Sequence, residues 1–192
     1  MKKLVTCKEM KDLDSTTIRE IGVPSEVLME RAALKVVEEI EKYLEKNERI
    51  LVVCGSGNNG GDGIAVARLL YLKGIRAEFC MVGNKDKMTR ETVLQYKIAT
   101  GYQVPEVNNP DWSEYTTIVD AVFGVGLTRP IEGHYADIIH EMNSARAKKI
   151  AVDIPSGVNG DTGLEMGIAF SADLTVTFGY RKRGLCFYPG RL

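Results

Sequence analysis

The chain has 192 residues, of which 44% are hydrophobic and 27% charged, a composition that is typical of a folded globular domain and excludes a disordered or coiled-coil protein. Its 25 basic and 26 acidic residues give a net charge of -1, which argues against a surface that coats nucleic acid. No apolar run is long enough to span a membrane, and the first residues lack the apolar core of a signal peptide. We therefore expect one domain over residues 1–192, with neither a nucleic-acid nor a membrane partner.

The cysteine spacing indicates a compartment. Cys7, Cys54, Cys80 and Cys186 are scattered and form no C-x-x-C pair. This spacing favours free thiols in a reducing compartment over a disulfide framework or a zinc site. We expect a cytoplasmic protein.

Two helices are predicted in the first 45 residues, before any segment that suggests chemistry. The apolar residues of the first recur loosely at helical spacing up to Gly22 and Pro24: Met10, Leu13, Ile18 and Ile21. Ser25 is expected to cap the second helix. Its buried stripe is predicted to comprise Met29, Ala33, Val36, Ile40 and either Tyr43 or Leu44.

Strands and helices then alternate. Arg49–Cys54 has the continuous apolar pattern of a strand buried on both faces of a parallel sheet. Further strands are predicted at Ala77–Val82, Thr117–Val122, Lys149–Ile154 and Leu174–Phe178, with a weaker run at Gln103–Val107. Helices are predicted at Ile64–Lys73, Met88–Thr100 and Tyr135–Ser144. Right-handed crossovers make this an α/β fold: a three-layer αβα Rossmann-like sandwich with a mostly parallel sheet and an N-terminal helical extension.

A glycine-rich segment follows the first of these strands. The segment Gly55–Gly63 contains a G-x-G-x-x-G match between a strand and a helix, the context in which that motif favours a bound anion. A plain tight turn is the alternative. A standard dinucleotide site also requires an acidic residue after the second strand, where this chain has Val82–Lys85, and Asp62 puts a negative charge near the expected phosphate. The segment therefore predicts a nucleotide ligand held differently from NAD in dehydrogenases.

Oxygen-bearing side chains stand at the ends of neighbouring strands. Asp120 lies inside an apolar strand, and Ser156 follows the next strand in the run Asp153–Gly157. Together with Asn59 they provide one carboxylate and two neutral oxygen donors, which suits a hard cation of low charge. The pattern is equally compatible with a structural Asp120 that accepts backbone N–H bonds.

Asp62 and Asp153 remain as candidates for proton transfer. Burial against apolar strand residues would raise a carboxyl pKa toward neutrality, as general acid–base chemistry requires. The alternative for each is an ionised carboxylate that caps a helix or stabilises a turn.

These residues together resemble the YjeF N-terminal domain family, the NAD(P)H-hydrate epimerases. The resemblance covers nearly the whole chain, although Ala33 stands where the family commonly has glycine. The matching segments are Val53–Gly63 with Ala67 and Arg68, Asp120–Gly124 with Gly126, Asp153–Gly157 with Asp161–Gly163, Met29–Ala33, and the late residues Thr177, Phe178 and Lys182.

The resemblance implies an isomerase that interconverts the R and S forms of hydrated NADH and NADPH (NADHX and NADPHX), which carry a hydroxyl at carbon 6 of the nicotinamide ring. It implies a potassium ion held by Asn59, Asp120 and Ser156. For the catalytic proton transfer our hypothesis is Asp153, with Asp62 and Lys182 as the next candidates. It also implies a homodimer formed through the N-terminal helices. The implied substrate-binding residues are Asn58, Asn59, Gly60, Gly61, Asp62, Gly124, Val125, Gly126, Leu127, Thr128, Arg129, Pro130 and Asp153.

The family also bears on the C-terminal end of the chain. Members usually continue beyond the point that corresponds to Pro189 and Gly190, so we expect this chain to be truncated there. Many members carry a second, kinase-like domain that dehydrates the S form with a nucleoside phosphate. The resemblance therefore allows a bifunctional native protein.

Two other functions compete with epimerisation. A conventional NAD(P) oxidoreductase would account for the G-x-G-x-x-G match but not for Asp62 or the missing ribose-binding acid. A non-catalytic module that binds RNA or protein is the other, since related domains have such partners. It gives no physical reason for an intact Asn58–Asp62 segment beside both Asp120 and Asp153.

Overall fold

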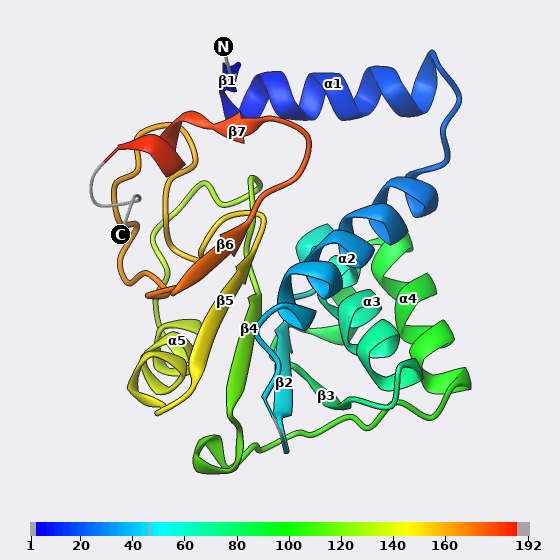
Figure 1. The fold of residues 1–192 in the computed structure, drawn as a ribbon. Coiled ribbons are helices and arrows are strands. Elements are labelled where there is room, and N and C mark those ends of the chain that lie inside the picture. Colours follow the sequence, from blue (N-terminus) through cyan, green and yellow to red (C-terminus); the bar gives the residue numbers. More distant parts are fainter. Residues whose placement is uncertain (1–2, 46, 188–192) are drawn as a thin grey trace.

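The centre of the protein is a parallel sheet of five strands in the order β3-β2-β4-β5-β6 (Figure 1). The computed structural model describes residues 3–45 and 47–187. The strands are β2 (Arg49–Cys54), β3 (Arg76–Met81), β4 (Thr117–Ala121), β5 (Lys148–Val152) and β6 (Leu174–Val176). Strand β2 is buried from Ile50 to Cys54, as its apolar sequence predicts for a strand that is covered on both faces.

The strand order places a topological switch point between β2 and β4. The chain runs from β2 outward to β3 and then returns to pair β4 with the other side of β2. Ligands of open α/β sheets bind beyond the carboxyl ends of the strands at such a point. The topology therefore locates the candidate site at the ends of β2, β4 and β5.

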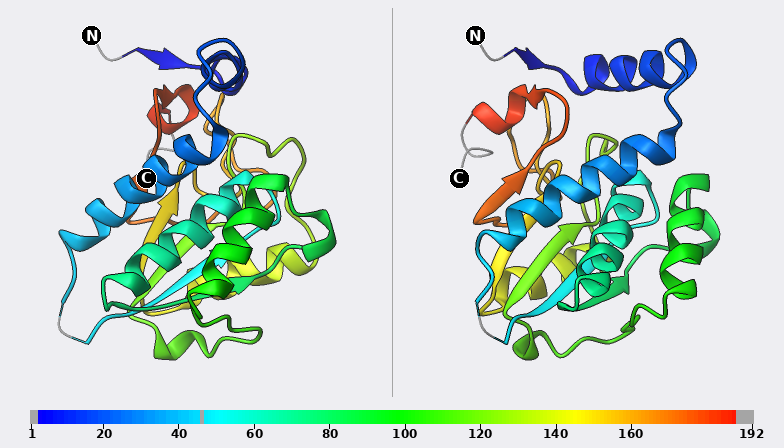
Figure 2. Two further views of the ribbon diagram at one scale, coloured as in Figure 1. Left: turned by 90° about the vertical axis from the view of Figure 1, so that its right-hand side faces the viewer. Right: turned by 45° about the vertical axis from the view of Figure 1, so that its right-hand side comes forward.

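Helices cover both faces of the sheet, so the predicted three-layer fold is confirmed. Helices α2 (Ser25–Glu41), α3 (Asn58–Leu72) and α4 (Arg90–Gly101) lie on one side and α5 (His134–Ser144) lies on the other (Figures 1 and 2). Alternate residues of β2 serve the two layers: Val52 packs in the core beneath α2–α4, and Leu51 packs in the core beneath α5.

The N-terminal extension reaches the far end of the chain. Strand β1 (Leu4–Val5) pairs in parallel with β7 (Arg181–Lys182), and α1 (Cys7–Arg19) follows β1 (Figure 1). Neither two-residue strand was predicted, because so short a run carries no recognisable periodicity. The predicted first helix is confirmed as α1; of its loosely spaced apolar residues Met10 is buried, whereas Leu13 and Ile21 are 40% and 70% exposed.

The second helix agrees with its predicted stripe but not with its predicted cap. Its stripe residues Met29, Ala33, Val36 and Ile40 are all buried. Pro24 is the N-cap residue, however, and Ser25 begins the helix. The Ser25 hydroxyl donates to Glu91 of α4 at 2.9 Å instead.

Several boundaries differ from the predictions. Helix α3 begins at Asn58, six residues before the predicted start at Ile64. The weak run Gln103–Val107 contributes one isolated bridge, between Glu106 and Phe79. Three short 3-10 turns complete the fold: η1 (Lys85–Lys87), η2 (Trp112–Glu114) and η3 (Arg183–Cys186). The expected truncation point at residues 189–190 lies outside the described residues.

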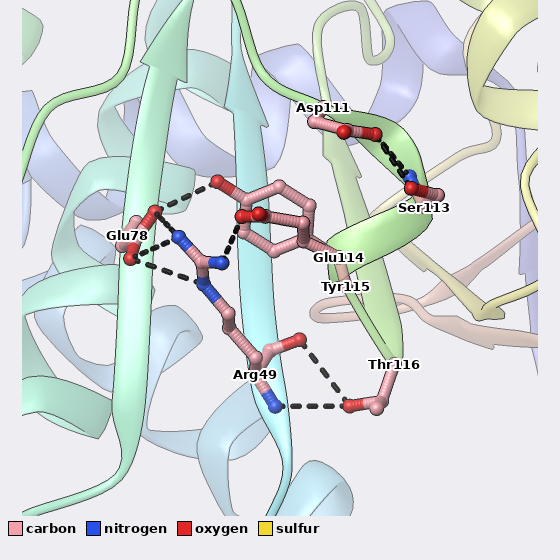
Figure 3. Close-up of polar contacts among 7 residues, drawn as sticks. All are labelled: Arg49, Glu78, Asp111, Ser113, Glu114, Tyr115 and Thr116. Carbon is pink, nitrogen blue, oxygen red and sulfur yellow. Dashed lines mark hydrogen bonds and ion pairs between the residues drawn. The ribbon is translucent and has the colours of Figure 1, made fainter.

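An ion-pair network ties the amino ends of β2 and β3 to the segment before β4 (Figure 3). Arg49 pairs with Glu78 at 3.1 Å and with Glu114, and its guanidinium lies 4.8 Å from the centre of the Tyr115 ring. This network is at the opposite end of the strands from the candidate site. Within residues 3–45 and 47–187 no helix is long and apolar enough to cross a membrane.

Candidate active site

The glycine-rich segment forms the turn after β2 and the first turns of α3. Gly57 is the N-cap residue of the helix. A methyl group at Gly60 would overlap the carbonyl oxygen of Gly55, and one at Gly63 would overlap the side chain of Ala121 in β4. Gly60 therefore allows α3 to lie directly against the turn after β2, and Gly63 allows it to lie against β2 and β4, which a plain turn would not require.

The β3 side of this segment is covered by protein. A methyl group at Gly83, after β3, would overlap the backbone nitrogen of Ser56. The hydroxyl of Thr92 donates to the Gly57 carbonyl at 2.9 Å, and the N–H of Thr89 donates to the Ser56 carbonyl at 3.0 Å. A standard Rossmann fold binds the adenosine ribose beside the end of the second strand. This packing opposes that mode of binding, in agreement with the missing acidic residue.

Asp120 and Ser156 form a buried pair at the ends of β4 and β5. Oδ1 of Asp120 accepts the Ser156 hydroxyl at 2.6 Å and the Val122 N–H at 3.1 Å, while Oδ2 accepts the Ser156 N–H at 2.7 Å. The Ser156 hydroxyl also accepts the N–H of Phe123 at 2.8 Å. The prediction that Asp120 accepts backbone N–H bonds is therefore confirmed.

These donors fit a monovalent cation. Burial raises the pKa of Asp120 to about 6 against the effect of its hydrogen bonds, and within residues 3–45 and 47–187 no lysine or arginine charge opposes this shift. The carboxylate has about four acceptor positions, of which three are used. Nδ2 of Asn59 is buried and has no hydrogen-bond partner among the described residues. If the side-chain amide is rotated by 180°, Oδ1 takes the place of Nδ2 and can act as a cation ligand. Each of these two groups is of a kind that a bound cation would stabilise.

Asp153 lies directly after β5 in a conformation that few residues adopt. Its φ of +69° is in the left-handed region, which is uncommon outside glycine and is often found at functional sites. Lys182 forms an ion pair with Oδ1 of Asp153, and the same oxygen accepts the Thr177 hydroxyl at 3.2 Å and the Phe178 N–H at 3.3 Å. The fold thus fixes the Asp153 carboxylate through one of its two oxygens.

Two further carboxylates approach this ion pair, Asp62 from α3 and Asp14 from α1. Burial, and next the negative charges of Asp153 and Asp14, raise the pKa of Asp62 well above its ordinary value, while Lys182 opposes the shift. Burial also raises the pKa of Asp14. Among the residues that the structure describes, no three acidic, histidine or cysteine side chains are arranged to hold a metal ion. The raised pKa values of Asp62 and Asp14 favour the protonated form of each carboxyl group.

The two segments that were predicted to contact substrate meet at Asn59 and Gly124. A Cβ built on Gly124 would lie 3.2 Å from Cγ and Oδ1 of Asn59. Along the loop from Gly124 to Pro130, Thr128, Arg129 and Pro130 are exposed at the surface. The inner end of this loop therefore borders the Asp120 centre, and its outer end faces solvent.

Sequence reasoning missed the contribution of α1. The N–H of Cys7 donates to Asp161 at 2.6 Å, and a methyl group at Gly179 would press on the Met10 side chain. Asp14 lies one helical turn after Met10, on the same face of α1. The i, i+4 spacing of Met10 and Asp14 indicates that they share one face of the helix, but the sequence does not show what that face contacts.

The chain is similar to known proteins over nearly its whole length. A family model described as "YjeF-related protein N-terminus" matches residues 25–184. A protein from Oenococcus oeni named "NAD(P)H-hydrate epimerase" is 49% identical over 189 residues, which cover 97% of this chain and 90% of that protein. A Limosilactobacillus fermentum protein of the same name is 45% identical over 188 residues, again 97% of this chain and 90% of that protein.

A solved structure confirms the fold. The yeast protein ynu0 (YNL200c) superimposes with a TM-score of 0.85 and 24% sequence identity, covering 96% of this chain and 83% of that chain. This agreement supports the sheet order and the placement of the helices.

Proposed function

Because this chain belongs to the family described as YjeF-related protein N-terminus, we propose that it is an NAD(P)H-hydrate epimerase, an isomerase that interconverts the R and S forms of hydrated NADH or NADPH. The observation that carries the proposal is the Asp153 carboxylate, held at the carboxyl end of β5 with three contacts on Oδ1. Among the described residues none donates to Oδ2, which we propose faces the ligand. The half-buried Asp62 carboxyl, whose raised pKa favours its protonated form, lies beside it.

The reaction that we propose is acid–base chemistry without redox change. A carboxyl group protonates the hydroxyl on carbon 6, the C–O bond breaks, and the ring nitrogen supplies the electron pair that makes a planar iminium and releases water. Water then adds to the other face, and a carboxylate takes its proton. Asp153 is the leading candidate for these transfers, because the fold fixes its carboxylate at the carboxyl end of β5. Asp62 is the second, because burial raises its pKa.

Binding of the dinucleotide is assigned to the two segments that meet at Asn59. We propose that Asn58–Asp62 and Gly124–Pro130 hold the phosphates and ribose, so that the nicotinamide ring is presented to Asp153. Fixing the remote part of a substrate in this way lowers the entropic cost of the reaction.

A potassium ion is the proposed cofactor. Asn59, Asp120 and Ser156 would hold it, since Asp120 has a buried, uncompensated carboxylate and Asn59 an unsatisfied amide. When bound, the ion would supply a fixed positive charge for the anionic substrate.

We also propose a homodimer that forms through the N-terminal helices in the cytoplasm. Three apolar side chains in α2 and in the segment between α1 and α2 are exposed: Ile21 at 70%, Val27 at 45% and Leu34 at 40%. Four free cysteines within the described residues suit a reducing compartment. A covalently linked C-terminal dehydratase domain in the native protein stays a prediction from the family.

The test is chromatographic. Purified R-NADHX is mixed with the protein in potassium buffer, and the appearance of the S epimer is compared with the spontaneous rate without protein. We expect acceleration by the wild type and a loss of about 100-fold or more in Asp153→Asn, the usual range for a group that transfers protons. Asp173→Asn is the matched control, because Asp173 accepts the Lys149 N–H at 2.7 Å at the opposite end of the sheet.

Two results would oppose the proposal. Wild-type protein that leaves the spontaneous rate unchanged would exclude the activity for this chain. An Asp153→Asn variant with wild-type turnover and unchanged binding would transfer the role to Asp62.

A further inference from the structure

Lys182 is one of the most deeply buried charged residues that the structure describes. Only 1% of its side chain is exposed, compared with 11% for Asp153. A buried ammonium group is stable only when it is paired and its hydrogen bonds are satisfied. The contacts of Lys182 therefore define what it can do.

All three N–H donors of the Lys182 ammonium are occupied. Besides Asp153 Oδ1, they reach the Thr177 hydroxyl at 3.1 Å and the Phe178 carbonyl at 3.0 Å. An ammonium group has three donors and no acceptor, so none remains for a substrate. This saturation argues against Lys182 as the group that transfers a proton to the nicotinamide hydrate, although the sequence left it a candidate.

The same contacts give the Asp153 carboxylate its orientation. Lys182, Thr177 and the Phe178 N–H all bind Oδ1, and no described residue donates to Oδ2. Without the ammonium, the remaining bonds of 3.2 and 3.3 Å are too long to hold a carboxylate in one rotamer.

The N-terminal segment supports Lys182 from the other side. Val5 is the partner of Lys182 in the parallel pairing of β1 and β7. Both residues of the pair are buried, and β1 is joined directly to α1, which Asp161 anchors through the N–H of Cys7. The backbone of Lys182 is thus paired with a strand from the other end of the chain, while its ammonium lies at the end of β6.

We propose that Lys182 is a positioning residue for the epimerisation: its ammonium fixes the Asp153 carboxylate through Oδ1, so that Oδ2 faces the substrate. This inference rests on the proposed function. The β1–β7 pairing keeps the lysine in place, so the N-terminal segment contributes to the site although it precedes residue 25, where the family match begins.

The test compares turnover and binding in Lys182→Met, Lys182→Arg and the control Lys149→Met. Lys149 also donates to two backbone carbonyls, those of Ala145 and Ala147, but it lies at the amino end of β5. We expect Lys182→Met to lower kcat about 100-fold with KM within about 3-fold of wild type, since a misplaced catalytic group costs turnover more than binding. Lys182→Arg keeps the charge with a different donor geometry and should lose about 10-fold. Lys149→Met should retain wild-type kcat.

Crystal structures of the wild type and Lys182→Met provide a readout that does not depend on activity. We expect the Asp153 carboxylate to leave its Oδ1-bound orientation in the variant. If Lys182→Met does not fold, Lys182→Gln is the second neutral variant, with the same expectation.

The outcomes separate the two proposals. Wild-type protein without epimerase activity would refute the proposed function, and the crystal structures would then decide the positioning role. Unchanged kcat in the neutral variants, a rise in KM alone, or an Asp153 carboxylate that keeps its orientation would each overturn the inference.

Discussion

Ser156 binds the Asp120 carboxylate twice, through its backbone N–H at 2.7 Å and through its hydroxyl at 2.6 Å. The two bonds join the segment after β5 to the carboxyl end of β4, where Asp120 is fully buried. They supply hydrogen-bond donors but no positive charge. The pair therefore forms a rigid, anionic centre that a small cation would complete.

The first prediction concerns this cation. Potassium chloride should raise the melting temperature relative to choline chloride at equal ionic strength, because an ion that binds only the native state stabilises it. The gain is about 1.4 kcal/mol when the free ion is at ten times its Kd. Asp120→Asn should abolish the difference between the two salts. Asp12→Asn removes an exposed carboxylate of α1 and should retain the difference in melting temperature. A wild-type protein with the same melting temperature in both salts would contradict the cation site.

The second prediction concerns Asp62 and pH. Its folded pKa is raised, so the native state binds the Asp62 proton more tightly than the unfolded state, and stability from this group falls as the pH rises above about 4, the pKa of an unfolded aspartate. Asp62→Asn removes this dependence. The free energy of unfolding of the variant should therefore exceed that of the wild type by an amount that grows from about pH 4 toward neutrality.

Urea unfolding of both proteins over this pH range provides the measurement. Asp86→Asn is a suitable control, because Asp86 is exposed in η1 and lies away from the acidic cluster. A constant difference between wild type and Asp62→Asn at every pH would show that Asp62 titrates normally.

The layered fold could be predicted because its signals are local. The apolar run Arg49–Cys54 and its successors each indicate a buried strand without reference to the rest of the chain. Because the carboxyl ends of parallel strands lie at one edge of a sheet, the sequence also predicts that Asp120 and Asp153 lie close together. Their exact partners followed from packing.

The remaining features depend on contacts between distant parts of the chain. The pairing of Val5 with Lys182 joins two strands of two residues each, which have no periodic pattern. Asp14 reaches the acidic cluster from α1, whose first residue is bonded to Asp161 far along the chain. The early start of α3 was missed for a different reason: glycines indicate a turn in sequence, but here they serve helix-to-strand packing.

That packing leads to the third prediction. Gly60→Ala should lower the free energy of unfolding by about 3 kcal/mol, because the added methyl group would collide with the backbone carbonyl of Gly55, which cannot move without disturbing β2. Gly57→Ala is the matched control in the same segment: a Cβ at Gly57 meets nothing within 4 Å, and its φ of -82° suits alanine. Chemical denaturation measures both, and equal stability of the two variants would contradict the close approach.

The last prediction separates stability from activity at the other end of the sheet. The Tyr115 hydroxyl donates to Glu78 at 2.7 Å inside the network around Arg49 (Figure 3). Tyr115→Phe removes this donor but leaves Glu78 paired with Arg49, so we expect a loss of about 1 kcal/mol in the free energy of unfolding. Tyr102→Phe, at an exposed tyrosine, should cost nothing measurable.

The rate of epimerisation by Tyr115→Phe should match that of the wild type below the melting temperature. The network around Arg49 lies at the amino end of β2, whereas the proposed chemistry lies beyond the carboxyl ends of the strands. A fall in kcat without a fall in stability would instead mean that the amino-end network acts on the site through the sheet.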